Sequence, residues 1–458
     1  MIVLKFGGTS VGDASAIGRA ASITRSRLPR RPVVVVSAMS GVTNALLLAA
    51  RDAAHGNRAA ADEALRSMRD RHMAALDALV ARGPDAEKVG CELDRIYDAL
   101  AGLTEALAIL GHVTPRSLDT MAAYGEQLSA RLVVAAFRGK GLPAVLVDAR
   151  QIVVTDDHFT SAAPLLEEIA SGAQRVLRPL VEDGQIPVLG GYIGATADGV
   201  TTTLGRGGSD FSASLIGAAL DAESIEIWTD VDGMLTADPR IEPRARPIDH
   251  IRFDEAAELA AFGARVLHPS TIAPAVRKGI PVCILNSFRP DAAGTRVTAS
   301  APELPVRAIA GRDDVTVIKV RTSEMLMAHG FLRALFDVFE RRETSVDVVA
   351  TSEVSVSVTV DDPAPIDAIA ADLACLGDVT VERGRAVISV VGAGLSGDSA
   401  TMARALGALA GIRVHMISVG ATEINLTFVV EAEQFRAAIR ALHGAFFAEQ
   451  HLGASVAA

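Results

Sequence analysis

Residues 5–10, Lys-Phe-Gly-Gly-Thr-Ser, combine a cation with two adjacent glycines. They follow the apolar run 2–4, which is typical of a buried strand that ends in a loop. Because glycine has no Cβ, the N–H groups of Gly7 and Gly8 can approach phosphate oxygens closely, with the ammonium of Lys5 beside them. This stretch therefore predicts a phosphate-binding loop.

A second glycine-rich stretch, residues 205–210, reads Gly-Arg-Gly-Gly-Ser-Asp. It stands before the helical pattern of residues 211–220, at the position of a helix N-terminus. The free N–H groups and the positive dipole of such an end favour anions. Cations and glycine amides facing anions fit phosphoryl transfer, in which catalysis is mostly positioning and charge neutralisation. We expect the two stretches to converge on one cleft.

Two generic nucleotide motifs need separate consideration. Gly7 and Gly12 have the spacing of a Walker loop, but Asp13 follows where a Lys is required, which excludes a P-loop. A G-x-G-x-x-G pattern occurs at 392–397, after the strand-like run 387–391. It fits a dinucleotide site or a tight strand-to-helix turn, and the motif alone does not decide between them.

Composition excludes several classes of function. The chain has 458 residues, enough for two to four domains, and a formal net charge of −11 without a basic stripe, which argues against a nucleic-acid partner. Its 3 cysteines are far apart and lack metal-ligand spacing, so we predict no protein-built metal site and a reducing, cytoplasmic environment. We expect no secretory leader and no membrane span.

The first part of the chain alternates strands and helices. The strand-like runs at 144–148, 186–190, 225–230 and 281–285 are separated by helical patterns. This alternation predicts a mostly parallel sheet with helices on both faces. Residues 44–138 have apolar side chains at helical spacing almost throughout, which predicts a helical insertion.

Polar side chains near the strand-like run 33–36 are candidates for ligand binding. Ser37 and Thr43 follow that run, and the carboxyl end of a strand is where α/β sheets bind ligands. A polar turn with a helix cap explains them as well. Glu126 lies in the helical region after a glycine that permits close approach, although most helical glutamates are simply solvated.

The last part of the chain contains an internal repeat. After a linker at 291–311, a strand–helix–strand–strand–helix order occurs twice, over 312–384 and 385–458. This is the βαββαβ pattern of ferredoxin-like modules. The second copy ends on its helix, so its last strand would have to come from elsewhere in the chain.

Several motifs together resemble those of the aspartokinases. The likeness spans essentially the whole chain and includes the tandem repeats, which look like the ACT domains of the lysine-sensitive, monofunctional type. The motifs are Lys-Phe-Gly-Gly-Thr-Ser-Val at 5–11, Ser-Gly-Val-Thr-Asn at 40–44, Thr-Thr-Thr-Leu-Gly-Arg-Gly-Gly-Ser-Asp at 201–210, Trp-Thr-Asp-Val at 228–231, Thr-Ala-Asp-Pro-Arg at 236–240 and Phe-Gly-Ala-Arg-Val-Leu-His-Pro at 262–269.

The resemblance implies an α/β fold: an amino-acid-kinase-type three-layer sandwich over residues 1–290, followed by two ferredoxin-like ACT domains. It implies an ATP-dependent kinase that phosphorylates the β-carboxylate of L-aspartate to 4-phospho-L-aspartate, with Mg²⁺ bridging the phosphates. This is the first step of the pathway to lysine, threonine and methionine. Feedback inhibition by lysine at the ACT domains and a homodimer formed through them are further implications.

Residue roles follow from the same resemblance. The implied catalytic residues are Lys5, Arg206 and Asp210. The implied aspartate-binding residues are Ser37, Thr43, Glu126, Arg206 and Ser209. The implied nucleotide-binding residues are Lys5, Gly7, Gly8, Thr229, Asp230, Leu235, Arg240, Arg265 and Val266. The implied effector-binding residues are Met325, Phe331, Val346, Asp347, Ser352 and Glu353.

The sequence departs from the family pattern at a few of these positions. Leu235 stands where a tyrosine often lies against the nucleotide, and Arg265 where a lysine is common, while Met327 and Ala328 replace polar residues near the effector positions. Two other functions stay open: a catalytically inert amino-acid sensor, and a related carboxylate or carbamate kinase on the same fold.

Overall fold

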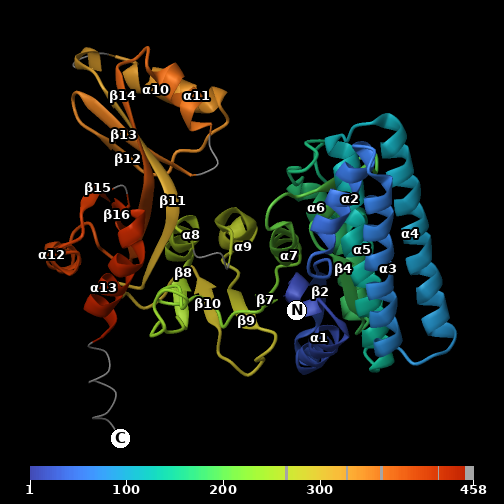
Figure 1. The fold of residues 1–458 in the computed structure, drawn as a ribbon. Helices are drawn as coiled ribbons and strands as arrows, with labels where there is room; N and C mark the ends of the chain where they lie inside the picture. The colour runs from blue at the N-terminus through green and yellow to red at the C-terminus, as the bar shows by residue number, and fades with distance from the viewer. Residues whose placement is uncertain (264–266, 326–328, 362–364, 421, 449–458) are drawn as a thin grey trace, which may run out of the picture. The chain divides into compact units, whose positions relative to one another are not determined.

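The computed structural model describes residues 1–458 except 264–266, 326–328, 362–364, 421 and 449–458 (Figure 1). The chain forms two compact units. The first comprises residues 1–234, 249–253 and 266–301, and the second comprises residues 235–248, 254–265 and 302–458. Among the described residues, no helix combines the length and apolar character that crossing a bilayer requires.

The first unit is built on an eight-stranded sheet in the order β3-β4-β2-β1-β7-β9-β10-β8. Pairing is parallel from β3 to β9, and only β10 runs antiparallel to its neighbour β9. This confirms the predicted mostly parallel sheet. The strands are β1 (Ile2–Phe6), β2 (Pro32–Val36), β3 (Ala144–Leu146), β4 (Ile186–Gly190), β7 (Ile225–Thr229), β8 (His250–Arg252), β9 (Val282–Asn286) and β10 (Thr295–Thr298).

The central strands β1, β2 and β4 are buried along their whole length, because helices cover the sheet. The helix α5 packs on β2, β3 and β4 and against α1, whereas α6 and α7 pack on each other and on β2. The helices are α1 (Ala14–Ser26), α2 (Val42–Ala54), α3 (Arg58–Leu79), α4 (Pro84–Leu110), α5 (Pro115–Gly139), α6 (Leu166–Glu182), α7 (Gly208–Ala219) and α9 (Ala273–Lys278). The strands β5 (Ile193–Ala195) and β6 (Thr201–Thr203) form a separate antiparallel pair, which follows β4 and precedes α7 in the chain.

The predicted helical insertion consists of α2 to α5, which lie side by side (Figure 1). Helix α5 begins at Pro115 with Thr114 as its N-cap, and Thr114 and Ser117 form a reciprocal capping box. The residues of α5 that face the sheet are buried, and they join the same apolar core as β1, β2 and β4. A helix anchored in this way can hold functional side chains rigidly.

The second unit contains a six-stranded sheet in the order β12-β13-β11-β14-β16-β15, in which all neighbours are antiparallel. Helices α10 and α11 pack on one half of it, and α12 and α13 on the other. The bounds are β11 (Ala308–Arg321), α10 (Phe331–Arg341), β12 (Val349–Thr351), β13 (Ser355–Asp361), α11 (Ile366–Leu373), β14 (Asp378–Val391), α12 (Ser399–Ala408), β15 (Val414–Val419), β16 (Asn425–Glu431) and α13 (Phe435–Phe447).

The two modules share their central strands. The second half of β11 pairs with β13 and with the start of β14, and the first half of β11 pairs with the end of β14. Each module thus has four strands in the ferredoxin-like order, and residues 308–312 serve as the last strand of the second module. This supplies the strand that the sequence left missing from the second repeat.

The segment 235–248 belongs to the second unit, although it lies within the range 1–290 that we predicted as the catalytic domain. Ala237 and Ile241 join the core around α13. The side chain of Arg440 donates a 2.8 Å hydrogen bond to the carbonyl oxygen of Ile241, and Thr236 shares a 3.0 Å hydrogen bond with His443. Helix α8 (Phe253–Ala261) contributes Glu258, which accepts a bond from Asn425 at 2.8 Å.

Candidate active site

The residues predicted to bind substrate and phosphate meet in one cavity of the first unit, with a volume of about 680 Å³. This size is in the range of ligand sites. The cavity is lined by the ends of β1, β2 and β7, by α5 and by the start of α7. Its predicted members are Lys5, Gly7, Gly8, Ser37, Thr43, Glu126, Arg206, Ser209, Asp210, Thr229 and Asp230.

The centre of the cavity is an ion pair between Lys5 and Asp210. The Nζ atom of Lys5 lies 2.6 Å from Oδ1 of Asp210. Lys5 sits near the end of β1, the strand between β2 and β7, and Asp210 lies in the first turn of α7. The side chains are only 10% and 16% exposed, so their attraction is weakly screened. The two glycine-rich stretches therefore converge as predicted.

The glycine loop after β1 is fixed by the neighbouring strands. Its backbone N–H at Gly7 donates a 3.0 Å hydrogen bond to the carbonyl oxygen of Trp228, and the hydroxyl of Ser10 donates to the same oxygen at 3.1 Å. A Cβ on Gly8 would lie 3.1 Å from the carbonyl oxygen of Ala38, closer than nearly all real contacts. Gly8 thus allows the loops after β1 and β2 to touch.

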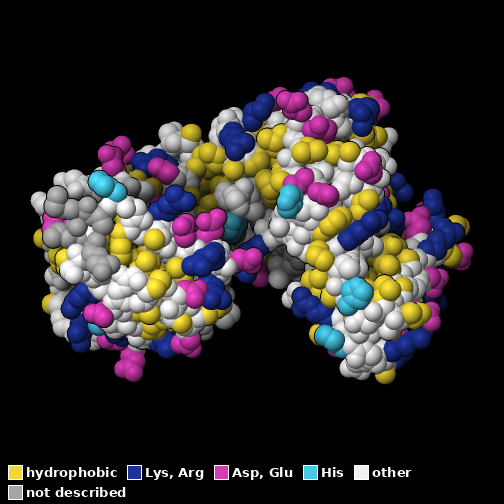
Figure 2. All heavy atoms as spheres, turned by 90° about the horizontal axis from the view of Figure 1, so that it is seen from above, with side chains coloured by type: hydrophobic (Ala, Val, Ile, Leu, Met, Phe, Trp, Pro, Cys, Tyr) yellow, Lys and Arg dark blue, Asp and Glu magenta, His cyan; other side chains and the backbone are white. Residues whose placement is uncertain are grey.

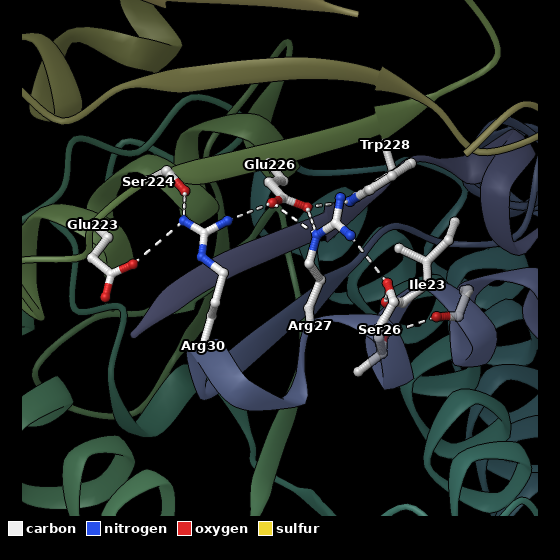
Figure 3. Close-up of polar contacts among 10 residues, drawn as sticks. Ile23, Ser26, Arg27, Arg30, Glu223, Ser224, Glu226 and Trp228 are labelled. Atoms are coloured by element: carbon white, nitrogen blue, oxygen red, sulfur yellow. Dashed lines mark hydrogen bonds and ion pairs between the residues drawn. The ribbon is translucent and has the colours of Figure 1, made fainter. Parts of the chain in front are cut away.

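A charge network around the buried Glu226 contacts Trp228, the residue whose carbonyl oxygen binds this loop (Figure 3). Glu226 on β7 is 3% exposed, and its carboxylate accepts hydrogen bonds from Arg27 at 3.1 Å and from Arg30 at 3.0 Å. The indole N–H of Trp228 donates to the same carboxylate at 3.2 Å, and Arg27 lies over the Trp228 ring. The residue whose carbonyl anchors Gly7 is therefore itself held in place through its side chain.

Glu126 is a buried acid in the cavity wall. It is 3% exposed, and its Oε1 accepts a 3.2 Å hydrogen bond from the backbone N–H of Ala38. Burial raises the pKa of Glu126 to about 8, and the Ala38 bond opposes that shift only partly. A Cβ on Gly190 would lie 2.9 Å from the Glu126 Cβ, and one on Gly125 would lie 3.0 Å from the Cβ of Ala38. These two glycines let α5 reach the strand ends.

The loop before α7 needs left-handed backbone at Gly205 (φ 75°) and Gly207 (φ 70°), which glycine adopts without strain. Arg206 lies exposed between them, on the cavity. The first turn of α7 then presents Ser209 and Asp210 with the free N–H groups of a helix start. This end of the cavity suits an anionic ligand.

Other cavity residues were not identified from the sequence. Thr160 and Tyr192 line the same space, and both have positive φ angles, 75° and 66°. Tyr192 follows the adjacent glycines Gly190 and Gly191, and such a pair is a signal that can be found in the sequence. The structure explains the second glycine, because a Cβ on Gly191 would lie 2.8 Å from the Ser209 Cβ. Thr160 carries no local signal in the sequence.

Not all predicted nucleotide residues lie in this cavity. Leu235 and Arg240 belong to the second unit, where Arg240 pairs with Asp238 at 2.6 Å. Arg265 and Val266 lie outside the described residues, as do Met327 and Ala328.

The predicted effector residues lie in the first repeat of the second unit. Met325, Phe331 and Val346 pack on its core, whereas Ser352 and Glu353 are exposed. The carboxylate of Asp347 pairs with Arg312 at 2.6 Å, and Arg312 also pairs with Asp361 at 2.7 Å.

The glycine motif at 392–397 has a structural explanation. A Cβ on Gly392 would lie 2.1 Å from the carbonyl oxygen of Pro305, so the backbone approach there requires glycine. Gly394 has a φ of 68°, between β14 and α12.

Neither the face shown in Figure 2 nor the potential metal ligands among the described residues indicate a second site. On the face shown in Figure 2, Lys and Arg side chains are interspersed with Asp and Glu. Within the part of the chain that the structure describes, no group of three or more His, Cys, Asp or Glu side chains is arranged to hold a metal.

Comparison with known proteins gives consistent matches. Residues 1–286 match the amino acid kinase family, and residues 388–446 match an ACT domain. The chain is 37% identical over 456 residues to lysine-sensitive aspartokinase 3 of Escherichia coli (strain K12), covering 98% of this chain and 99% of that protein. It is 36% identical to the chloroplastic aspartokinase 1 of Arabidopsis thaliana, covering 97% and 80%.

Solved structures agree with the sequence matches. The crystal structure of E. coli aspartokinase III in complex with aspartate and ADP, in the R-state, superposes with a TM-score of 0.85 at 36% identity, covering 98% of this chain and 100% of that one. The T-state structure of the same enzyme with lysine and aspartate gives a TM-score of 0.82, covering 98% and 99%.

Proposed function

This chain belongs to the aspartokinases of the amino acid kinase family, and from that membership we propose the following reaction for the cavity around Lys5 and Asp210. A β-carboxylate oxygen of L-aspartate attacks the γ-phosphorus of ATP, and the bond from that phosphorus to the bridging oxygen of ADP breaks. The products are 4-phospho-L-aspartate and ADP. The nucleophile is already ionised at neutral pH, so no general base is required.

The observation that carries this proposal is the Lys5–Asp210 pair beside a glycine loop. The Lys5 ammonium can neutralise charge on the transferring phosphoryl group, and the amides of Gly7 and Gly8 can bind its oxygens. Asp210 and a bound phosphate would compete for the Lys5 ammonium. We infer that nucleotide binding shifts the Lys5 ammonium towards phosphate and frees the Asp210 carboxylate to interact with bound cations.

Recognition of aspartate needs opposite charges at its amino-acid end. Arg206 offers a planar fork for the α-carboxylate, and the buried Glu126 can form an ion pair with the α-ammonium once its carboxyl group gives up its proton. Ser37, Thr43 and Ser209 line the cavity between them with hydroxyl groups that can bind the remaining oxygens. The arrangement suits a short amino acid with a carboxylate side chain.

We propose that ATP binds with Mg²⁺ against Asp210, Thr229 and Asp230. Mg²⁺ is usually bound through one or two carboxylates and the substrate phosphates, and Asp210 and Asp230 supply two of the carboxyl groups that line this cavity. When bound, Mg²⁺ supplies charge neutralisation to the phosphate oxygens. The further nucleotide contacts proposed for Leu235, Arg240, Arg265 and Val266 rest on the family motifs alone.

Lysine is the proposed effector, because the similar E. coli enzyme is described as lysine-sensitive and has been solved with lysine. The candidate contacts are Met325, Phe331, Val346, Asp347, Ser352 and Glu353. A homodimer through the ACT domains and a cytoplasmic location also remain proposals. The domain boundaries 1–290, 291–311, 312–384 and 385–458 are proposed on the sequence pattern.

A steady-state assay of ADP release tests the function. We expect turnover with L-aspartate, far less with glutamate or N-acetylglutamate, and inhibition by added lysine. No turnover with any acceptor would support the inert sensor, and preference for another acceptor would support a related carboxylate kinase. The presence of Lys5, Arg206 and Asp210 in one cavity favours an active kinase over the inert sensor.

A further inference from the structure

We propose that Asp119 is a positioning residue for aspartate binding, because it holds the Thr160 turn and the end of β6 against α5. It thereby sets where Arg206 lies relative to Glu126. The inference rests on the proposed function and names a residue that neither the family motifs nor the cavity lining includes.

The carboxylate of Asp119 is buried and satisfied by three donors from two separate segments. Asp119 is 1% exposed. Its Oδ1 accepts the hydroxyl of Thr203 at 2.6 Å, its Oδ2 accepts the backbone N–H of Thr203 at 3.0 Å, and the N–H of Thr160 donates to both oxygens at 3.0 and 2.9 Å. Both backbone partners can only donate, so a carboxylate suits this position and an amide does not.

The first segment that Asp119 holds is under backbone strain. Thr160 has a φ of 75°, a conformation that non-glycine residues rarely adopt, and it lines the cavity. Strain of this kind persists only where surrounding contacts impose it. The bond to Asp119 is such a contact.

The second segment leads directly to the Arg206 loop. Thr203 ends β6, two residues before Gly205. The two segments also touch, since Ala162 donates a 2.9 Å backbone bond to Thr203, and a Cβ on Gly205 would lie 3.3 Å from the Thr160 carbonyl oxygen. Asp119 therefore holds both sides of the turn that presents Arg206.

The helix that carries Asp119 also carries Glu126, two helical turns further along, so both residues face the same side. Both side chains are buried, at 1% and 3% exposed. An amino acid held at its α-carboxylate and its α-ammonium requires a fixed distance between the two partners. Asp119 links the Arg206 loop to the same rigid helix and so fixes that distance.

The test compares Asp119→Asn with Ser129→Ala. Ser129 is a matched control, because it is buried on α5 and its hydroxyl has no hydrogen-bond partner within the described residues. We expect Asp119→Asn to raise KM for aspartate about tenfold, with KM for ATP within about twofold and a smaller loss in kcat. Ser129→Ala should leave all three constants near those of the parent.

Amide hydrogen exchange gives a readout that does not depend on turnover. Exchange at residues 158–163 and 203–208 should quicken in Asp119→Asn and not in Ser129→Ala. An inactive parent enzyme would reject the proposed function, and the exchange data would still decide whether Asp119 holds the two segments. Unchanged exchange would overturn the inference.

A rise in KM for aspartate without a rise in KM for ATP distinguishes a positioning role from a general disturbance of the active site. Equal rises in both KM values, or a KM for aspartate no different from that of Ser129→Ala, would overturn the positioning role. If Asp119→Asn does not fold, Thr203→Val removes the hydroxyl donor to Asp119, together with the hydrogen bond between that hydroxyl and the Tyr192 side chain, and keeps the backbone N–H donor. That variant should raise KM for aspartate several-fold, and an unchanged KM would refute the proposal.

Discussion

The ammonium of Lys5 lies 2.6 Å from the carboxylate of Asp210, although about two hundred residues separate them in the sequence. Strand β1 and helix α7 pack together, so the pair is imposed by the fold rather than by local sequence. Two opposite charges that are mostly withdrawn from water attract each other strongly. The same pair sits beside the glycine amides that we propose bind phosphate.

Replacing Lys5 by Ala should abolish most turnover and leave the fold intact. Loss of a group that neutralises transition-state charge typically lowers kcat by about 100-fold or more. Lys278→Ala is a matched control, since Lys278 forms an exposed 2.9 Å ion pair with Asp221, and exposed pairs contribute little. Steady-state kinetics and thermal unfolding of both variants provide the measurement. Near-parental kcat in Lys5→Ala would remove this role.

Glu126 should make stability depend on pH. Its pKa in the folded protein is raised to about 8, mainly by burial, from an ordinary value of 4.5. An acid with a raised pKa stays protonated in the folded state while the unfolded state releases its proton. Its stabilising contribution is therefore complete below about pH 4.5, falls as the pH rises to about 8 and is constant above that.

The variant Glu126→Gln tests this dependence, because glutamine keeps the shape of glutamic acid and cannot ionise. The difference in unfolding free energy between variant and parent should grow in favour of the variant from pH 5 to pH 8, by on the order of a few kcal/mol. Urea unfolding at several pH values measures it. Parallel stability curves for the two proteins would contradict the raised pKa.

The parts of the site that the sequence predicted are those with local signals. Glycines next to charged residues at strand ends and helix starts identified Lys5, Arg206 and Asp210, and strand–helix alternation identified the parallel sheet. These signals work because the backbone approach to a ligand and the burial of a strand constrain consecutive residues.

The parts that the sequence did not predict depend on long-range packing. A buried helical aspartate such as Asp119 looks like any helical acid until its partners from two other segments are known. Likewise, nothing local indicates that segment 235–248 packs against α13, or that residues 295–298 in the expected linker 291–311 form strand β10.

In the network around Glu226, removing the two arginines should destabilise the protein more than removing the charge of the glutamate (Figure 3). Removing both Arg27 and Arg30 leaves a carboxylate that is 3% exposed without its cations, which typically costs about 3–5 kcal/mol. Glu226→Gln removes the buried charge instead, and the two arginines, 28% and 39% exposed, keep access to water.

We therefore expect the double variant Arg27→Ala/Arg30→Ala to be clearly less stable than Glu226→Gln in urea unfolding. Arg66→Ala, which breaks an exposed 2.7 Å pair with Glu63, serves as the control and should leave stability near that of the parent. Equal destabilisation by the double variant and by Glu226→Gln would show that the buried charge is not the cause.

Asp347 should determine sensitivity to lysine if the effector binds where the family motifs place it. Its side chain is 23% exposed and its carboxylate pairs with Arg312, which also binds Asp361, so an ammonium group can reach it only by sharing or displacing that guanidinium. A hydrogen bond between charged groups contributes about 1.5–3 kcal/mol, so Asp347→Ala should raise the lysine concentration for half inhibition about tenfold or more.

Asp372→Ala, which breaks the 2.7 Å pair with Arg342 in the same module, should leave inhibition unchanged. Dose–response curves for lysine on the parent and both variants measure the effect, and unaltered inhibition in Asp347→Ala would exclude this residue from the effector site.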